Sequence, residues 1–223
     1  MIDNRLLTCA KLVCGKKAVD VGTDHGYLSV YLVQEKICDE VIACDINVKP
    51  LEAAKKSIAL AGVASKVKTI LSDGLDNISC DGVTDVIIAG MGGELIAKII
   101  EKCQWLFEKD KKVNLILQPM SKSEILRKWL YDNNFLVKNE IACKDGDFIY
   151  SVLQCEINSE KIKYSCDDRY IYGGKVTSDY ADGVEYLNRQ AHRLKTAGQG
   201  MLKSEDKKDE GKKLIEIAEN LLK

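Results

Sequence analysis

The chain has 223 residues, of which 46% are hydrophobic and 30% are charged, and its formal net charge is −1. These values are typical of a soluble globular protein, and the length suits one medium domain with a modest extension. The balanced charge excludes a global basic excess of the kind that indicates nucleic acid, but it allows a local basic face. No apolar run approaches a membrane span and the first residues lack a signal-peptide pattern, so we expect a cytoplasmic protein.

The cysteines and histidines give no metal motif. No two of the nine cysteines are spaced Cys-x-x-Cys, and His25 and His192 are the only histidines. Because zinc sites need closely spaced ligands of these types, no metal is expected. An odd number of cysteines without a secretion pattern favours reduced, mostly buried thiols.

Short β-branched apolar runs alternate with longer segments of helical spacing in the first part of the chain. The expected strands are residues 17–21, 40–45, 66–71, 83–89 and 114–118, and the expected helices are residues 27–34, 48–61, 94–102 and 122–133. Strands that alternate with helices predict right-handed βαβ units, and therefore a parallel sheet covered by helices on both faces.

From residue 135 the pattern changes to two strands, 135–143 and 148–156, joined through Asp145-Gly146. This dipeptide is typical of a hairpin turn. An antiparallel strand that finishes a mostly parallel sheet is the ending of the Rossmann-like methyltransferase fold, by analogy at the level of the fold. We therefore expect an α/β first domain over residues 1–160.

Beyond residue 164 the chain carries two apolar stripes with coiled-coil-like spacing. The first runs through Tyr180, Val184, Leu187, Ala191, Leu194 and Met201, and the second through Leu214, Ile215, Ala218, Leu221 and Leu222. A polar stretch separates them, and Ser204 is the expected N-cap of the second helix. The pattern predicts a small C-terminal domain, residues 164–223, built as an antiparallel helical hairpin.

The segment from Asp20 to Gly26, at the end of the first expected strand, reads Asp-Val-Gly-Thr-Asp-His-Gly. Glycines allow the backbone to approach a ligand closely while it turns into a helix. A dehydrogenase loop would read Gly-x-Gly-x-x-Gly and receive a pyrophosphate, and this sequence lacks that spacing. The carboxylates of Asp20 and Asp24 would repel a pyrophosphate but attract a cationic ligand. S-adenosylmethionine, which carries ammonium and sulfonium groups, is the cofactor we expect.

Acidic residues also stand at the ends of the next two expected strands. Asp45 is followed by Ile46 and Asn47, and Asp73 by Gly74 and Leu75. Alone, each is equally consistent with a helix N-cap or a simple turn. Because open α/β sheets bind ligands at the carboxyl ends of their strands, we expect Asp45 to accept hydrogen bonds from ribose hydroxyls and Asp73 from the adenine amino group.

The fourth and fifth expected strands end in Ala89-Gly-Met-Gly-Gly93 and Gln118-Pro-Met120. A glycine-rich loop after a buried strand would let a planar substrate lie against the backbone beside the methyl donor. A tight strand-to-helix turn explains the same glycines equally well. Met91, Met120 and Tyr27 are candidate walls for a base, and each of them is also a reasonable core residue.

Four segments together resemble a known family. They are Asp-Val-Gly-Thr-Asp-His-Gly-Tyr-Leu (20–28), Ser-Asp-Gly-Leu (72–75), Ala-Gly-Met-Gly-Gly (89–93) and Leu-Gln-Pro-Met (117–120). Their order and spacing are similar to those of the bacterial tRNA (adenine-22-N1)-methyltransferases, whose helical C-terminal extension matches residues from about 164 onward. The resemblance covers essentially the whole chain. It implies transfer of a methyl group from S-adenosylmethionine to N1 of adenosine 22 in the D-arm region of tRNA.

This chemistry suits a site with few obvious bases. Neutral adenine N1 already presents a lone pair, so the attack needs alignment more than deprotonation, and a carboxylate could stabilise the cationic product. The expected catalytic residues are Asp24 and, second, His25, with Met91 and Gly92 beside them. The expected cofactor-binding residues are Asp20, Gly22, Thr23, Gly26, Asp45, Ile46, Asn47, Asp73, Gly74, Leu75, Ala89 and Gly90. The expected substrate contacts are Tyr27, Gln118, Met120, Arg189 and Arg193.

Other interpretations remain open from the sequence alone. A methyltransferase that acts on a protein or a small molecule is favoured by the absence of a strong basic patch, and a non-catalytic nucleoside- or RNA-binding module could keep the same fold. His25 is more often a structural residue of such a loop than a catalytic one. The sequence does not fix the oligomeric state, and a monomer is the simpler expectation.

Overall fold

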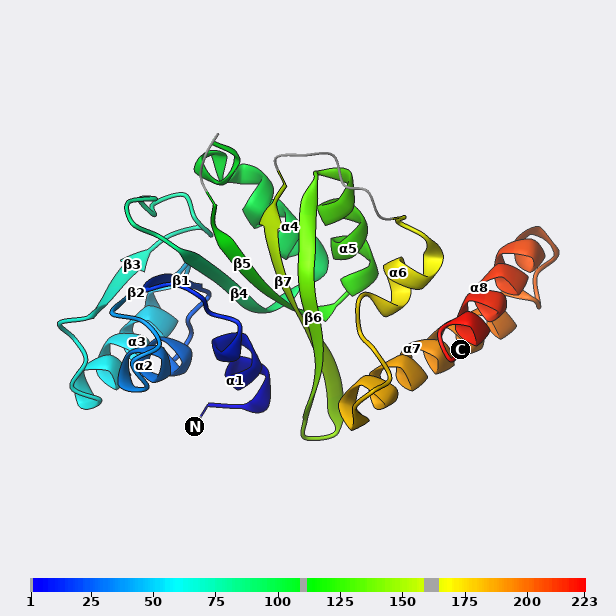
Figure 1. The fold of residues 1–223 in the computed structure, drawn as a ribbon, viewed down its shortest axis with the longest axis horizontal. Coiled ribbons are helices and arrows are strands. Elements are labelled where there is room, and N and C mark those ends of the chain that lie inside the picture. Colours follow the sequence, from blue (N-terminus) through cyan, green and yellow to red (C-terminus); the bar gives the residue numbers. More distant parts are fainter. Residues whose placement is uncertain (1, 109–111, 159–164) are drawn as a thin grey trace.

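The computed structural model describes residues 2–108, 112–158 and 165–223. A seven-stranded sheet runs through its centre in the order β3-β2-β1-β4-β5-β7-β6 (Figure 1). The strands are β1 Lys17–Val21, β2 Glu40–Asp45, β3 Val67–Leu71, β4 Asp85–Gly92, β5 Asn114–Ser121, β6 Phe135–Asp145 and β7 Phe148–Ile157. The first five pair in parallel, and β7 is antiparallel to both β5 and β6. The expected methyltransferase-type sheet is thereby confirmed.

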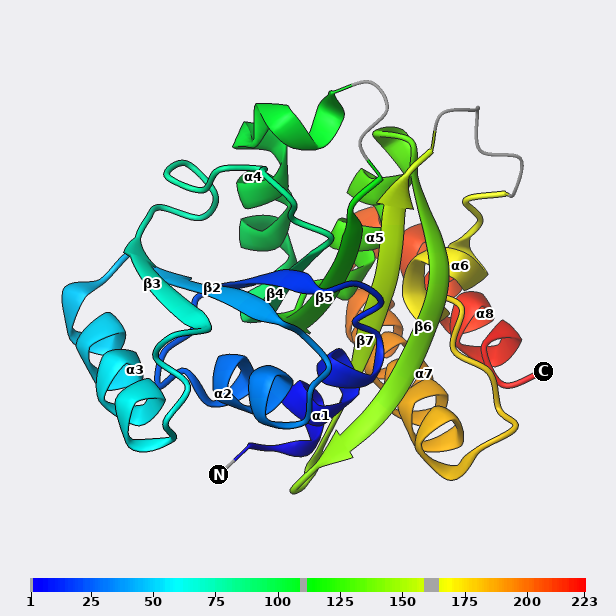
Figure 2. The same cartoon turned by 60° about the vertical axis from the view of Figure 1, so that its left-hand side comes forward.

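Helices cover both faces of the sheet (Figure 2). One face carries α1 Asn4–Lys11, α2 Tyr27–Gln34 and α3 Val48–Leu60, and the other carries α4 Gly93–Lys102 and α5 Ser123–Asp132. The central strands explain why both faces need cover. In β4, Val86 and Ile88 pack with α4 and α5, whereas Ile87 packs with α1 and α2. Alternate side chains of a strand point to opposite faces, so a continuous apolar run buries both of them.

Two differences from the sequence-based expectation bear on the site. Strand β4 covers Asp85–Gly92 instead of residues 83–89, because the longer β5 continues to pair with it through two register shifts. Gly90, Met91 and Gly92 therefore belong to an irregular strand end, and the glycine-rich loop expected there is wrong. Helix α1 was not expected. It begins after Asp3, whose side chain accepts a hydrogen bond from the Leu6 amide at 2.9 Å, as an N-cap does.

The C-terminal helices are α6 Asp168–Gly173, α7 Ala181–Met201 and α8 Lys208–Asn220. Helices α7 and α8 form the expected antiparallel hairpin, which projects from the rest of the molecule (Figure 1). Ala191 and Leu194 pack there against α8. A Cβ atom built on Gly198 would stand 2.6 Å from the carbonyl oxygen of Gly211. Two small residues thus let the two helix backbones approach closely.

Three details of the expected hairpin are wrong. Ser204 precedes a short 3-10 turn, Glu205–Lys207, and α8 begins only at Lys208, so Ser204 does not cap α8. Val184 and Leu222 are exposed, although both lie in the expected stripes. Ile217 is buried in the hairpin instead. The register of a two-helix contact depends on which faces meet, and sequence spacing alone does not settle that.

The first half of α7 packs on the sheet and belongs to its core. Tyr186 and Leu187 are buried with Ala142 of β6 and Val176. This contact anchors the hairpin to the long final strands. The first half of α7 therefore packs on the sheet, and its second half packs against α8.

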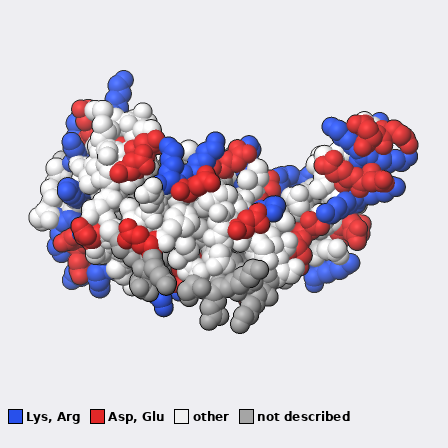
Figure 3. Space-filling view, turned by 90° about the horizontal axis from the view of Figure 1, so that it is seen from above, with Lys and Arg blue, Asp and Glu red and all other residues white. Residues whose placement is uncertain are grey.

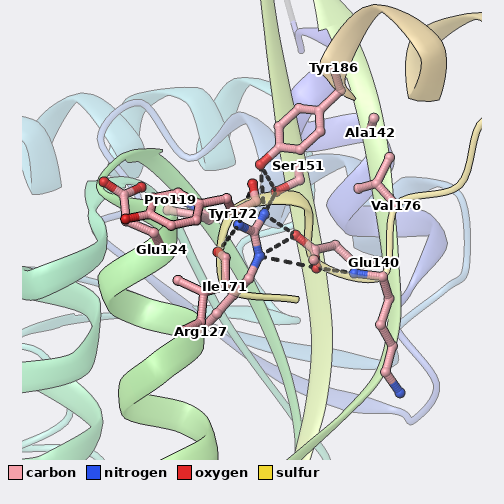
Figure 4. Close-up of polar contacts among 12 residues, drawn as sticks. Pro119, Glu124, Arg127, Glu140, Ala142, Ser151, Ile171, Tyr172, Val176 and Tyr186 are labelled. Atoms are coloured by element: carbon pink, nitrogen blue, oxygen red, sulfur yellow. Dashed lines mark hydrogen bonds and ion pairs between the residues drawn. The ribbon is translucent and has the colours of Figure 1, made fainter. Parts of the chain in front are cut away.

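Beneath this contact lies a buried ionic network centred on Arg127 of α5 (Figure 4). Its guanidinium donates to Glu140 at 2.6 Å and to the hydroxyl of Tyr186 at 2.6 Å. It also donates to the carbonyl of Ile171 in α6 at 2.8 Å. Burial is the largest single effect and would lower the pKa of Arg127, but the charge and hydrogen bonds of Glu140 and Tyr186 together raise it. The network joins α5, α6, β6 and α7.

All nine cysteines are free thiols and six of them are buried, which confirms the expectation of reduced, mostly buried residues. Burial raises the pKa of the Cys44 thiol to about 12. Among the described residues, no helix is both long enough and apolar enough to cross a membrane.

Candidate active site

A cavity of about 380 Å³ opens at the carboxyl ends of β1 and β4. The strand order reverses between these two strands, and open α/β sheets bind their ligands at such a point. The cavity is lined by Asp3, Arg5, Leu6, Asp20, Gly22, Thr23, Asp24, His25, Tyr27, Leu28, Ala89, Gly90 and Met120. The structure thus brings together most of the residues expected in the first loop and two of those expected at the end of the fourth strand.

The loop after β1 is held by its backbone. The amides of Gly22 and Thr23 both donate to the carbonyl of Cys44, at 2.8 and 2.9 Å. Gly22 has a φ of +73°, and a Cβ atom there would stand 2.4 Å from the terminal methyl of Met91. A side chain at this position would be strained and would clash, so the close passage of the loop requires glycine. Gly26 also has a φ of +73° and lies against Ala54 of α3.

Asp20 forms the buried floor of the cavity and is only 4% exposed. Its carboxylate accepts hydrogen bonds from the hydroxyls of Thr23 and Ser29, both at 2.7 Å. Burial raises the pKa of the Asp20 carboxyl, while the two hydroxyl donors act in the opposite direction. A cation bound beside this group would favour its ionised form, so the floor is matched to a positively charged ligand.

Asp24, His25 and Tyr27 stand at the mouth of the cavity. Asp24 has a left-handed φ of 51°, which turns its backbone so that the side chain is 69% exposed. The ring of His25 stacks on that of Tyr27 with 5.4 Å between the centroids, and its Nε2 lies 3.8 Å from the Asp24 carboxylate. A carboxylate and two flat rings therefore surround the entrance of the cavity.

The acidic residues at the ends of β2 and β3 lie outside the lining of this cavity. Asp45 is 8% exposed, and its carboxylate accepts a hydrogen bond from the Asn47 amide at 2.8 Å. Asp73 forms an ion pair with Lys102 of α4 at 3.3 Å. Ile46 and Asn47 are exposed, Leu75 is buried, and Gly74 packs against Ile99. These strand ends continue the edge of the sheet beyond the cavity floor.

On the β4 and β5 side, Ala89, Gly90 and Met120 line the cavity. Gln118 is fully buried, and its side-chain oxygen accepts from the Gly90 amide at 3.0 Å and from Arg5 at 2.9 Å. Gln118 therefore holds the cavity wall in place and does not present itself to a base. Met91 packs beside Gly22, and Gly92 is the residue before α4; neither lines the cavity.

Helix α1 supplies site residues that sequence reasoning missed. The Arg5 side chain forms an ion pair with Asp3 at 2.5 Å, binds Gln118 and lies 5.7 Å from the centre of the Tyr150 ring. It thus ties the start of the chain to β5 and β7 at the edge of the cavity. The only sequence signal for this helix was Asp3 in an N-cap position, which is common and unspecific.

The two arginines expected to contact substrate lie farther along α7. Arg189 donates to the carbonyl of Asp147 at 2.7 Å and to Glu185 at 2.6 Å, so it joins the β6–β7 turn to α7. Arg193 binds both carboxylate oxygens of Glu124 at 3.3 Å. Arg193 also lines a second cavity, of about 260 Å³, which shares Met120 with the first.

Within the described ranges, no three histidine, cysteine or acidic side chains gather closely enough to hold a metal ion.

Comparison with known proteins agrees with the class that the fold and the cavity define, a Rossmann-like methyltransferase. The pattern of the family described as "Methyltransferase domain" matches residues 2–153. A Bacillus subtilis relative named tRNA (adenine(22)-N(1))-methyltransferase is 33% identical over 167 residues, which are 73% of this chain and 68% of the relative. This chain belongs to the family of the tRNA (adenine(22)-N(1))-methyltransferases.

Solved structures agree over the full length. The M. capricolum TrmK structure, in complex with S-adenosyl-homocysteine, has a TM-score of 0.82 and 26% identity, covering 100% of this chain and 98% of that one. A Streptococcus pneumoniae structure in complex with S-adenosyl-L-methionine has a TM-score of 0.85 and 29% identity, covering 100% of both chains. The C-terminal helices are therefore included in the likeness.

Proposed function

We propose that this protein transfers the methyl group of S-adenosylmethionine to N1 of adenosine 22 in tRNA. The observation that carries the proposal is the cavity at the reversal point of the sheet, with a buried carboxylate at its floor and an exposed carboxylate at its mouth. The relative from Bacillus subtilis bears the name of this activity, and the structural relatives were solved with the methyl donor or its product.

The residues present fit this cofactor. The positive φ of Gly22 turns the loop along the cavity wall, and Asp20 and Asp24 line the same cavity, where they would face a ligand whose ammonium and sulfonium groups are positive. Asp45, at the tip of β2, would accept hydrogen bonds from the ribose hydroxyls of a cofactor that extends along the sheet edge beyond the cavity lining. The bound cofactor supplies an electrophilic methyl group. Asp73, whose exposed carboxylate pairs with Lys102 through one oxygen, would accept a hydrogen bond from the adenine amino group.

The chain's own contribution is alignment and charge. Neutral adenine N1 carries a lone pair in the ring plane, so the protein has to orient the base rather than remove a proton. Tyr27, stacked with His25, and Met120 offer apolar surface at the mouth for the base. Asp24 is close enough to the same opening to stabilise the positive charge that develops on the methylated ring. His25 orients this group of residues through its contacts with Asp24 and Tyr27.

We further propose that residues 164–223 form the tRNA-contacting region, and that the protein works in the cytoplasm, where tRNA is found. Figure 3 shows that the projecting hairpin carries basic and acidic side chains interleaved, without a single-sign surface on that face. Binding would then depend on a few placed cations and on shape rather than on bulk charge. A base in folded tRNA must also be unstacked before the cavity can receive it.

The test uses purified protein, labelled S-adenosylmethionine and an unmodified tRNA transcript. We expect 1-methyladenosine at position 22 after digestion, and no label in a transcript that carries guanosine at that position. Equal labelling of both transcripts would contradict the assignment to adenosine 22. Label found on protein, or nowhere despite cofactor binding, would contradict the tRNA proposal.

A further inference from the structure

The second cavity lies beside the first, on the side toward the C-terminal helices. Its walls come from the end of β5, the start of α5, strand β7 and helix α7, and they include Met120, Glu124, Tyr150, Ser151, Tyr186 and Arg193. Met120 lines both cavities. Arg5 lines the first cavity, and its guanidinium lies over the ring of Tyr150, which lines the second cavity. The two cavities therefore share one partition and stand next to each other.

The size of the second cavity limits what it can hold. Its volume of about 260 Å³ is below the ~300–1,000 Å³ typical of pockets that enclose drug-sized ligands. A single base or a ribose phosphate suits this space, whereas a second complete cofactor does not. The half-buried ring of Tyr150 offers a stacking surface, and the hydroxyls of Ser121 and Ser123 offer hydrogen bonds.

One ion pair joins two walls of this cavity. Arg193 of α7 meets Glu124, in the first turn of α5, through both carboxylate oxygens. The Arg193 side chain is 50% exposed and that of Glu124 21%. An ion pair exposed to this degree contributes little to stability. A phosphate is a stronger bidentate partner for a guanidinium than a partly hydrated carboxylate, so it can take the place of Glu124.

We propose that the second cavity receives a nucleotide adjacent to the target adenosine, and that Arg193 exchanges Glu124 for the phosphate of that nucleotide. The inference rests on the proposed action on tRNA. Unstacking the target base exposes the neighbouring backbone, and the second cavity is the hollow that adjoins the methyl-transfer cavity through Met120. Before RNA binds, Glu124 holds the Arg193 guanidinium at this cavity. A phosphate must then displace the Glu124 carboxylate in order to bind Arg193.

The charges around the cavity support an anionic ligand of this kind. Lys122, which also lines it, forms an ion pair with Glu94 of α4 at 2.7 Å. Each cation is thus matched to one carboxylate that an RNA backbone can replace. Neutralising a backbone phosphate releases counterions, so the exchange has a measurable salt signature.

The test measures binding of unmodified tRNA to the full-length protein in the presence of S-adenosyl-homocysteine, as a function of salt. We expect Arg193→Ala to weaken tRNA binding about tenfold and to reduce the slope of log K against log salt by about one. Lys56→Ala is the control, since it removes an exposed cation from α3, a helix that lines neither cavity and lies outside the proposed tRNA-contacting region. It should leave the slope unchanged.

Glu124→Gln supplies the second arm. It removes the competitor of the phosphate, so it should tighten tRNA binding several-fold in the wild-type background and have no effect in the Arg193→Ala background. A normal salt slope for Arg193→Ala, or a gain from Glu124→Gln that persists without Arg193, would overturn the inference. Methylation at position 22 is scored separately. If Arg193 affects binding as expected but no methyl group is transferred, the proposed function fails and the phosphate site does not.

Discussion

At the residue scale, two carboxylates of one short loop are in opposite environments. Asp20 is buried under Thr23 and Ser29, whereas Asp24 is turned outward by a left-handed backbone. The sequence predicted a catalytic role for Asp24 and a cofactor-binding role for Asp20, but it did not show that one is buried and the other exposed. The structure assigns Asp20 to the floor and Asp24 to the mouth, and the two environments lead to different predictions.

The first prediction concerns Asp20→Asn. A raised pKa in the folded protein means that the ionised carboxyl opposes folding, and that this effect grows as pH rises through the folded pKa. We expect the substitution to raise the Tm of the ligand-free protein at pH 7, with a difference that shrinks at acidic pH. It should weaken binding of S-adenosyl-homocysteine by about 1–3 kcal/mol, because a charged partner is lost.

Thermal unfolding over a pH series, with and without S-adenosyl-homocysteine, measures both effects. Leu60→Ala is a suitable control, because this exposed side chain lies at the end of α3, away from the cavity lining. If Asp20→Asn lowers the Tm of the ligand-free protein at pH 7, the buried carboxylate does not oppose folding and the prediction is wrong.

The second prediction concerns Asp24→Asn. Asparagine tolerates the left-handed backbone of this position, so the loop should keep its shape while the charge is removed. We expect kcat for tRNA methylation to fall by about tenfold to a hundredfold, since the developing cation loses a partly exposed carboxylate. Cofactor affinity should change less. Steady-state kinetics with tRNA measure the loss, and an unchanged kcat would remove Asp24 from the catalytic group.

At the element scale, Arg127 determines how α5, α6 and α7 meet the last strands. The guanidinium and the Glu140 carboxylate are both fully buried, and Glu140 also accepts from the Lys175 amide at 3.0 Å. In Figure 4 the side chains of Ser151 and Tyr186 point toward the same guanidinium. Tyr186 and Ser151 line the second cavity as well, so the network that anchors α7 also shapes that hollow.

The third prediction follows from this network. Arg127→Met should destabilise the fold by about 3–5 kcal/mol, because it leaves a buried carboxylate without its partner. The double variant Arg127→Met with Glu140→Gln should recover much of that loss, since no unpaired charge remains. Urea unfolding of the single and double variants gives both values. A single variant as stable as a surface substitution, within about 0.5 kcal/mol of the wild type, would show that the pair has no structural weight.

At the scale of the whole molecule, the expected division at about residue 160 cuts through a shared core. Residues 164–223 supply Tyr186 and the carbonyl of Ile171 to Arg127, and the Lys175 amide to Glu140. Their removal would uncover the buried ion pair. The outer hairpin is different, because Ala191 and Leu194 belong to a separate cluster with α8, Tyr172 and Leu214.

The fourth prediction compares two truncations. A chain that ends after Gln190 keeps Tyr186 and Leu187, so it should fold and bind S-adenosyl-homocysteine while losing methylation of tRNA. A chain that ends before residue 164 should be strongly destabilised, for the reason given for Arg127. Calorimetry and the tRNA assay distinguish the two. Full tRNA methylation by the chain that ends after Gln190 would show that the removed helical segments do not contact RNA.

The sequence by itself determined the local elements and their class. The apolar runs of β1, β2 and β4 and the helical spacing between them specify a parallel sheet, because each run can bury its side chains only between two helical layers. The Asp145-Gly146 turn predicted the antiparallel pair of strands that ends the sheet, and the apolar stripes beyond residue 164 predicted the helical hairpin. The loop from Asp20 to Gly26 located the cavity, since the end of a strand fixes where its loop must lie.

Only the tertiary structure decided which distant residues meet. Arg5 reaches Gln118, Arg127 pairs with Glu140, and Arg193 pairs with Glu124, and in each case partners far apart in the chain are joined by packing. Gly90 and Met91 likewise entered β4 because β5 continues beside them. Periodicity reports on contacts within one element. Contacts between elements depend on how the layers pack, and the cavity at Asp20 and Asp24 was complete only when α1 and β5 closed its sides.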